Sequence, residues 1–190
     1  GLLLGRLSWL AVKKWRRQMA VDNVIKSGLA ATSAAAEQIV KESVYRFGPM
    51  MLEVLRFPQL TKEKIDSMVQ ITGGDYLREA LAHGRGAVLI TAHSGNWELL
   101  GATLAFHGYP TVAVVKKQSD QGADRFINEY RTLAGMHVTY KTSVREMVRL
   151  LGEGKIVGLL MDQDAGADGI IVDFFGRPAS SPQGPAALAR

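Results

Sequence analysis

The pattern of apolar and polar positions changes near residue 80 of this 190-residue chain. Before that point, apolar residues at helical spacing predict a helix from residue 33 that continues past Gly48 and Pro49 toward residue 57. They also predict a helix over residues 61–71 with Thr61 as its cap. After that point, short apolar runs alternate with helical segments. The expected strands are residues 87–92, 111–115, 137–140, 156–161 and 170–172, and the expected helices are residues 97–106, 120–134 and 143–152.

This alternation predicts an α/β fold, in which a helical N-terminal segment precedes an αβα sandwich with a mostly parallel sheet. We expect a membrane-proximal helical segment over residues 1–80 and an α/β core over residues 81–190, together forming one structural domain. A chain of this length with 47% hydrophobic content can bury one substantial core. Because the last residues form an apolar helical run without a stop signal, we expect the core to be truncated at its C-terminus.

The most informative stretch is AVLITAHSGNWELL at residues 87–100, where a buried strand is followed by a histidine and then by a helix that carries an acid. The turn before the helix ends at Asn96, a good N-cap, so His93 lies in the turn and Glu98 in the first helical turn. On one continuous helix, His93 and Glu98 would lie about 140° apart around the axis and could not meet. Sites in parallel sheets gather at the carboxyl ends of strands, where His93 and Asp162 are both expected.

His93 and Glu98 are therefore candidates for a base and the carboxylate that orients it. Neutral imidazole can take a proton from a hydroxyl group, and a carboxylate on its other nitrogen fixes the tautomer and stabilises the imidazolium. Such a pair predicts the transfer of an acyl group to an alcohol. The spacing is not specific by itself, but none of the other three histidines has an acid at this spacing or follows a buried strand.

The block HSGNWE at His93–Glu98 resembles the His-x4-Asp/Glu block of glycerolipid acyltransferases, in the form typical of the bacterial lipid A biosynthesis (late lauroyl/myristoyl) acyltransferase family. Similar blocks occur in the family's order at residues 16–23 (RRQMAVDN), 130–135 (YRTLAG), 161–166 (MDQDAG) and 172–189 (VDFFGRPASSPQGPAALA). The chain departs from the family where Y-R-P and a later Asn are common, because Val115, Lys116, Lys117 and Asp120 occupy that stretch. The resemblance covers nearly the whole chain.

The resemblance implies an O-acyltransferase that moves a fatty acyl chain from an acyl thioester, carried by acyl carrier protein, to a hydroxyl of a lipid A precursor. The alternative within this class is acylation of another glycolipid or glycerolipid, such as a phosphatidylinositol mannoside. No cofactor or metal is expected.

The resemblance also implies roles for individual residues. His93 would be the catalytic base and Glu98 its partner. Arg131 would stabilise the oxyanion or hold an acceptor phosphate, and Asp162 would position Arg131 or a substrate group. The other expected substrate-binding residues are Asn96, Trp97, Gln163 and Phe175.

The net charge of +5 is unevenly placed, because Lys13, Lys14, Arg16 and Arg17 surround Trp15 directly after the apolar stretch GLLLGRLSWLAV. This stretch is too short to span a bilayer, but apolar residues followed by basic ones are typical of a helix at an anionic membrane surface. We therefore expect a location at the cytoplasmic face of the inner membrane. An amphipathic helix with a solvated basic face is the alternative.

Other classes of function have less support. The chain lacks the interleaved basic and aromatic residues of a nucleic-acid site, and its lack of cysteine excludes disulfides and thiolate zinc sites. Motifs for dinucleotides, nucleoside triphosphates, calcium and serine hydrolase chemistry are each incomplete. A non-catalytic membrane-surface or partner-binding module remains the second hypothesis.

Overall fold

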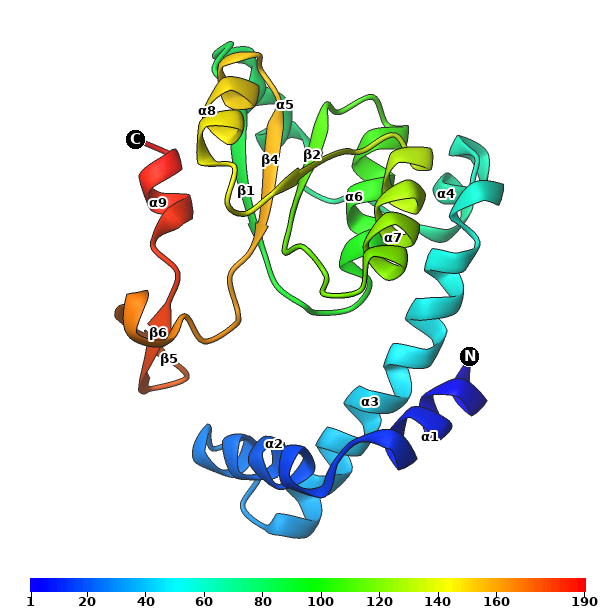
Figure 1. Cartoon of the computed structure of the whole chain (residues 1–190), viewed down its shortest axis with the longest axis vertical. Helices are drawn as coiled ribbons and strands as arrows, with labels where there is room; N and C mark the ends of the chain where they lie inside the picture. Colours follow the sequence, from blue (N-terminus) through cyan, green and yellow to red (C-terminus); the bar gives the residue numbers. More distant parts are fainter. The chain divides into compact units, whose positions relative to one another are not determined.

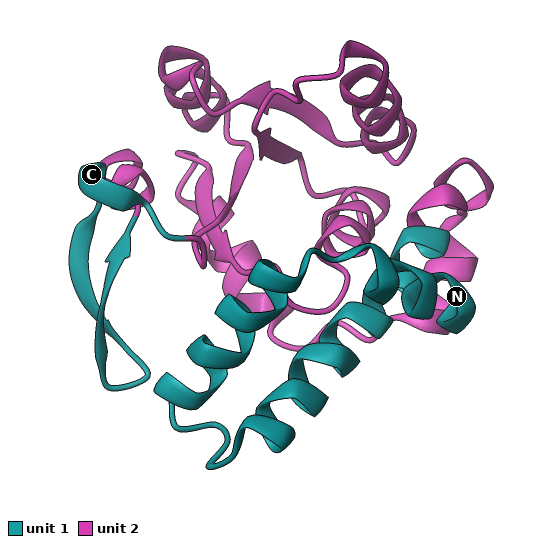
Figure 2. Ribbon diagram, turned by 60° about the horizontal axis from the view of Figure 1, so that its bottom comes forward, with its two compact units in different colours: residues 1–53, 164–181 teal, residues 54–163, 182–190 magenta.

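The computed structural model describes residues 1–190, whose helices and strands are labelled in Figure 1. These residues form two compact units, which Figure 2 shows in different colours. Unit 1 contains residues 1–53 and 164–181, and unit 2 contains residues 54–163 and 182–190. The boundary expected near residue 80 lies inside unit 2.

Unit 2 is built on a four-stranded parallel sheet (Figure 1). Its strands are β1 (Ala87–Thr91), β2 (Thr111–Val115), β3 (His137–Tyr140) and β4 (Ile156–Leu160). Their order across the sheet is β1-β4-β2-β3, so the last strand in the sequence lies between the first two. In the register of β1 with β4, Thr91 lies opposite Leu160. The residues that follow these two strands therefore emerge at the same edge, and the predicted α/β fold is confirmed.

Helices pack against both faces of this sheet. They are α6 (Trp97–Phe106), α7 (Gln121–Leu133), α8 (Val144–Gly152) and α9 (Gly184–Leu188). Ala113 of β2 packs on the cluster formed by α6 and the end of α7, whereas its neighbours Val112 and Val114 pack on the cluster of α8 and α9. This alternation follows from the two-residue period of a strand and gives the sandwich two separate apolar layers.

The rest of unit 2 precedes the sheet in the sequence. It consists of the short 3-10 helix η1 (Phe57–Gln59) and the helices α4 (Lys62–Met68) and α5 (Gly74–Ala82). Thr61 caps α4 by accepting a hydrogen bond from the main-chain N–H of Lys64, as predicted from the sequence. Phe57 is almost fully buried in the same apolar cluster as α6. This segment therefore belongs to the core of unit 2.

The N-terminal part of unit 1 consists of three helices, α1 (Leu2–Ala11), α2 (Lys14–Lys26) and α3 (Ser33–Leu55). The predicted helix through Pro49 is confirmed, because α3 continues past this proline. α1 crosses α3 at Gly5 and Gly48, where a Cβ added to either glycine would overlap main-chain atoms of the other helix. The two glycines therefore allow direct contact between the helix backbones. No helix of the protein is both long and apolar enough to cross a membrane.

Unit 1 also contains an antiparallel hairpin of β5 (Ile170–Phe174) and β6 (Arg177–Ser181), preceded by the 3-10 turn η2 (Gly166–Asp168). The sequence predicts a strand at residues 170–172, but not its partner β6. The hairpin turns through Phe175 and Gly176, both with positive φ, as a two-residue turn between right-twisted strands requires. The expectation that this strand continues the alternation of strands and helices in the main sheet is therefore wrong, because the strand pairs with β6 in a separate sheet.

Candidate active site

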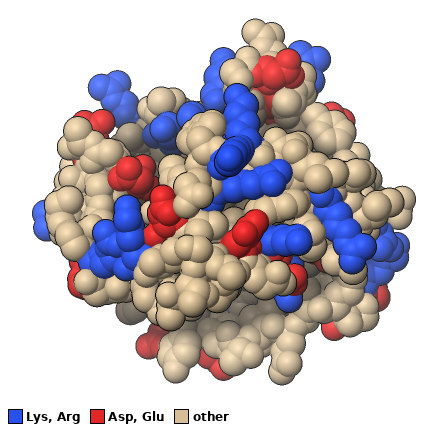
Figure 3. All heavy atoms as spheres, turned by 90° about the horizontal axis from the view of Figure 1, so that it is seen from below, with Lys and Arg blue, Asp and Glu red and all other residues tan.

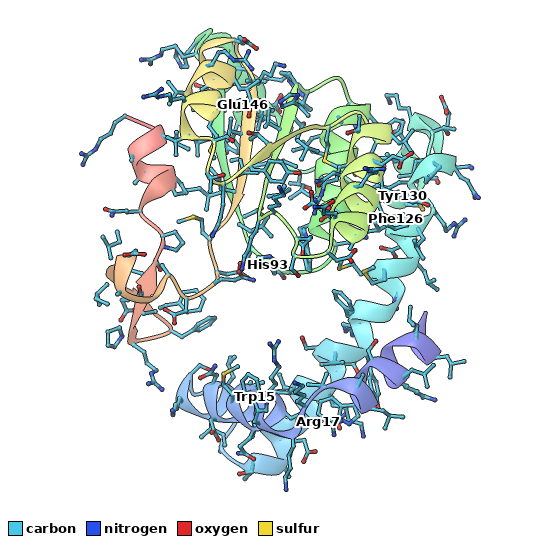
Figure 4. The ribbon with its side chains drawn as sticks, in the orientation of Figure 1. Trp15, Arg17, His93, Phe126, Tyr130 and Glu146 are labelled. Atoms are coloured by element: carbon cyan, nitrogen blue, oxygen red, sulfur yellow. The ribbon has the colours of Figure 1, made fainter.

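The register of β1 and β4 brings His93 and Asp162 together, although they lie 69 positions apart in the sequence. Each residue comes just after the carboxyl end of its strand, and Figure 4 shows His93 at this edge. α6 begins at Trp97, and Asn96 caps it by accepting a hydrogen bond from the main-chain N–H of Leu99 at 2.9 Å. The predicted placement of His93 in the turn between strand and helix is confirmed.

Asp162 holds both the main chain and the side chain of His93. Its Oδ2 accepts a hydrogen bond from the main-chain N–H of His93 at 2.8 Å, and its Oδ1 lies 2.8 Å from His93 Nδ1. An ionised carboxylate can only accept, so in the neutral imidazole Nδ1 carries the proton and Nε2 keeps its lone pair. The Trp97 ring packs edge-on against the imidazole, with a centroid distance of 4.9 Å. The arrangement presents an oriented imidazole whose free nitrogen is a base.

The charge of Asp162 depends on this contact. Burial raises the pKa of the Asp162 carboxyl, but hydrogen bonds from the side chain and main chain of His93 outweigh burial and leave the pKa below its usual value. Asp162 is therefore an anion across the neutral range. Because its pKa is lower in the folded state than in the unfolded state, it contributes to stability at pH values above the unfolded-state pKa. This contribution is lost as the pH falls through the folded-state pKa.

Glu98 lies in the first turn of its helix, as predicted, but its carboxylate does not contact His93. Its carboxylate pairs with Arg131, whose Nε donates to Oε2 at 2.9 Å and whose Nη2 donates to Oε1 at 2.5 Å. The predicted pairing of Glu98 with His93 is corrected, because Glu98 binds Arg131 and Asp162 orients His93. Of the two roles predicted for Asp162, positioning of Arg131 is corrected as well, and contact with a substrate group stays a prediction. Glu98 lies in the first turn of α6 and Arg131 in the last turn of α7, so each charge also complements its helix dipole.

Replacing Glu98 by glutamine is expected to lower the free energy of unfolding by about 3 kcal/mol, because the guanidinium of Arg131 would remain buried without its counter-charge. The two side chains are only 7% and 13% exposed. The control is Glu42→Gln, which removes the exposed pair with Arg46 and is expected to cost less than about 0.5 kcal/mol. Denaturant unfolding of both variants measures the difference. Equal losses would contradict a structural role for the buried pair.

A cavity of about 290 Å³ adjoins these residues. Apolar side chains of β1, β2 and β4 form part of its wall, together with Met136. Of the residues expected to form the site, His93, Trp97, Glu98, Arg131 and Gln163 line the cavity. An apolar pocket with a few convergent polar groups is typical of a binding site for a small or chain-like ligand.

Two further expected substrate contacts lie elsewhere. Asn96 is the N-cap of α6. Phe175 belongs to unit 1, at the tip of the β5–β6 hairpin, and its ring packs edge-on against Phe174. Their contacts with substrate stay predictions.

Among the cavity residues that sequence reasoning did not assign to the site are Lys116 and Gln118. Both lie in the loop that follows β2. The carboxyl end of β2 meets the same edge of the sheet as the ends of β1 and β4, so the loop after it was a candidate from the strand pattern alone. Because the sequence of this loop departs from the family pattern, the resemblance to the family did not indicate these two residues.

Comparisons with known proteins agree with this architecture. The family described as "Bacterial lipid A biosynthesis acyltransferase" matches residues 3–190. Phosphatidylinositol mannoside acyltransferase of Mycobacterium tuberculosis (strain CDC 1551 / Oshkosh) is 33% identical over 165 residues, which cover 83% of this chain and 52% of that protein. The Mycolicibacterium smegmatis (strain ATCC 700084 / mc(2)155) protein of the same name is 28% identical over 158 residues, which cover 80% of this chain and 52% of that protein.

The chain therefore spans about half the length of the curated relatives that it matches. The match to the family extends through both units, from α1 to the last residue. It includes the strand, turn and helix that carry His93 and Glu98, and the strand end that carries Asp162. The chain belongs to the bacterial lipid A biosynthesis acyltransferase family.

Proposed function

We propose that the protein transfers a fatty acyl chain from an acyl thioester to a hydroxyl group of a glycolipid. The observation that carries this proposal is the hydrogen-bonded pair of His93 and Asp162 beside a largely apolar cavity. Imidazole with a fixed tautomer is suited to deprotonate an alcohol, and the apolar wall is suited to an acyl chain. Membership of an acyltransferase family supports the same reaction.

In the proposed mechanism, Nε2 of His93 takes the proton of the acceptor hydroxyl as its oxygen attacks the thioester carbonyl. Asp162 stabilises the imidazolium that forms. The tetrahedral intermediate then collapses, the carbon–sulfur bond breaks, and the imidazolium returns its proton to the leaving thiolate. The products are an ester and a free thiol. This sequence needs no covalent bond between the acyl group and the protein.

Arg131 is the candidate for stabilising charge in this reaction. A guanidinium carries five N–H groups, and three of them are used in bonds to Glu98 and Asn128, which leaves two. Because Arg131 lines the cavity, the free groups can donate to the developing oxyanion or to a phosphate of the acceptor.

The acceptor that we favour is a phosphatidylinositol mannoside or a related glycolipid, because the matched curated relatives carry that substrate in their names. A lipid A precursor is the second candidate, and the description of the family supports it. For the donor we propose an acyl chain on acyl carrier protein, as the resemblance implies.

Transfer of a labelled acyl chain by the intact protein tests the proposal. Each donor, acyl carrier protein or another acyl thioester, is offered with each acceptor, and mass spectrometry identifies the acylated lipid. Labelled ester on the mannoside supports the favoured acceptor, and ester on the lipid A precursor supports the second. Absence of transfer to any lipid hydroxyl would contradict an enzymatic function and favour the non-catalytic membrane module.

We also propose that unit 1 contacts the cytoplasmic face of the inner membrane. The leucines of α1 are exposed although they are apolar: Leu2, Leu3, Leu4, Leu7 and Leu10. Exposed Trp15 and the basic residues around it follow directly in the chain. Figure 3 shows several groups of basic side chains on one face of the molecule, with acidic side chains and neutral surface among them. Apolar and basic side chains together favour binding to anionic lipid.

Charge reversal at Lys13, Lys14 and Arg16 is expected to weaken binding to anionic vesicles. Each basic residue near such a surface contributes about 1 kcal/mol, and salt screens this contribution. Arg17 is left unchanged because it donates hydrogen bonds to the main chain at Trp9 and Val12 and stacks over the Trp9 ring. Figure 4 labels Arg17 beside Trp15.

Vesicle sedimentation at low and high salt measures this effect. The matched control reverses three exposed basic residues of unit 2 that lie outside the N-terminal cluster, Arg85, Lys141 and Arg145. Binding that is unchanged by reversal of the N-terminal cluster, or that does not depend on salt, would show that this basic cluster is an ordinary solvated face.

A further inference from the structure

A network of hydrogen bonds lies behind Arg131 and centres on Asp124, a buried residue in the first turn of α7. Asp124 Oδ1 accepts from the main-chain N–H of Gln118 at 2.7 Å. Its Oδ2 accepts from the Tyr140 hydroxyl at 2.6 Å and from the side-chain amide of Asn128 at 3.3 Å. Asp124 itself does not line the cavity that contains His93.

Asn128 connects this network to Arg131. Its Oδ1 accepts a hydrogen bond from Arg131 Nη1 at 2.8 Å, while its Nδ2 donates toward Asp124. A carboxylate accepts only and a guanidinium donates only, so the two neighbours fix which way the amide points. Asp124 therefore holds the amide oxygen of Asn128 against the one terminal nitrogen of Arg131 that Glu98 does not bind.

The same carboxylate also fixes the loop after β2. Gln118, whose main-chain N–H donates to Asp124, lines the cavity, and so does Lys116 in the same loop. One buried anion thus anchors two separate parts of the cavity wall, the loop and the guanidinium. Hydrogen bonds from Gln118 and then Tyr140 hold the pKa of Asp124 below its usual value, so this anchor is charged at neutral pH.

Asp124 has no ion-pair partner within 4.0 Å, but the charges of Lys117 and Arg131 and the dipole of α7 also favour its ionised form. Because the carboxylate is ionised, it is a stronger acceptor than a neutral amide would be at this position. Its hydrogen bonds go to the two places that adjoin the cavity wall, Gln118 and the Asn128 amide behind Arg131.

We propose that Asp124 and Asn128 are positioning residues for acyl transfer, which hold the Arg131 guanidinium and the loop at Gln118 in the arrangement that the substrate meets. The inference rests on the proposed function. It adds two residues outside the cavity that act on the reaction through Arg131 and through the loop.

The test compares Asn128→Leu, Asn128→Gln and Asp124→Asn with the unchanged intact protein. Asn128→Leu removes the acceptor for Arg131, and we expect kcat/KM for the acceptor to fall about tenfold. Asn128→Gln keeps an amide that can accept from Arg131 and donate to Asp124, so it should recover part of that loss per folded molecule. Asp124→Asn keeps the shape but not the charge, and a smaller loss is expected. Glu129→Gln is the matched control, since it removes an exposed carboxylate from the same helix without touching the network.

Measuring the effect of Asn128→Leu in a second background, in which Arg131 is already changed, distinguishes a positioning role of Asn128 from a general effect on stability. In an Arg131→Lys background, Asn128→Leu is expected to cost less than about twofold, because the group that it positions is already altered. Equal losses in both backgrounds, or equal rates per folded molecule for Asn128→Leu and Asn128→Gln, would overturn the proposal.

Rotation about the Nε–Cζ bond of Arg131 gives a second measurement that does not need substrate. NMR of arginine-labelled protein should show this rotation to be about tenfold faster in Asn128→Leu than in the unchanged protein or in Glu129→Gln. Unchanged rotation would overturn the positioning of Arg131. If the unchanged protein transfers no acyl group while the rotation responds as expected, the proposed function is wrong, but the inference that Asn128 positions the Arg131 guanidinium is supported.

Discussion

Replacing His93 by alanine is expected to lower the rate of acyl transfer by about 10²–10⁴-fold, the usual contribution of a general base. The imidazole lies at the carboxyl edge of the sheet, is held by Asp162 and Trp97, and lines the cavity. Its side chain is 34% exposed, so its removal should leave the fold of unit 2 intact.

The control for this prediction is His83→Ala, which removes an exposed histidine at the end of α5. Initial rates of transfer, together with circular dichroism to confirm folding, decide the outcome. A His93→Ala protein that keeps near-parental activity would contradict the mechanism, whichever acceptor proves correct.

The second large effect is expected from Asp162→Asn, which should lower the rate by about 10²-fold or more. The amide can donate as well as accept, so Nδ1 of His93 would no longer be held as the protonated nitrogen. The imidazolium would also lose its counter-charge. Because both residues act as one unit, the double variant with His93→Ala should be no slower than His93→Ala alone.

Glu98→Gln provides the comparison for Asp162→Asn. Both changes remove one carboxylate near the cavity, but only Asp162 contacts His93. We expect Glu98→Gln to act mainly on stability, with a smaller loss of rate per folded molecule. If Glu98→Gln lost as much activity per folded molecule as Asp162→Asn, the assignment of the histidine's partner from the structure would be wrong.

The position of His93 could be predicted from sequence because it depends on local signals. An apolar run predicts β1, Asn96 predicts the start of α6, and together they place the histidine in the turn. The parallel sheet follows from the alternation of strands and helices. These inferences need no knowledge of which side chains meet across the fold.

The partner of His93 could not be predicted in the same way. Trp97 and Glu98 are consecutive on α6, so their side chains point about 100° apart around the helix axis. Trp97 faces the imidazole, and Glu98 consequently faces the end of α7, where Arg131 binds it. The sequence contains two acids at suitable places, Glu98 and Asp162. Only the register of β1 with β4 determines which of them reaches the histidine.

The hairpin of unit 1 shows a different limit to what the sequence can predict. The apolar residues 170–172 do form part of a strand, but a strand pattern does not say which strand lies beside it. The partner β6 is the segment RPASS, which has little apolar character and contains a proline. A proline is tolerated there because this two-stranded sheet has no interior strand.

The central place of β4 has a consequence for how the protein is made. During synthesis, β1, β2 and β3 are complete before β4, yet β1 pairs with no other strand of the sheet. Until β4 inserts, β1 keeps unpaired edges, which are sites of aggregation in incomplete chains. The same insertion delivers Asp162 to His93. A nascent chain that ends before β4 therefore lacks both the complete sheet and the oriented base, because both require β4 to be in place.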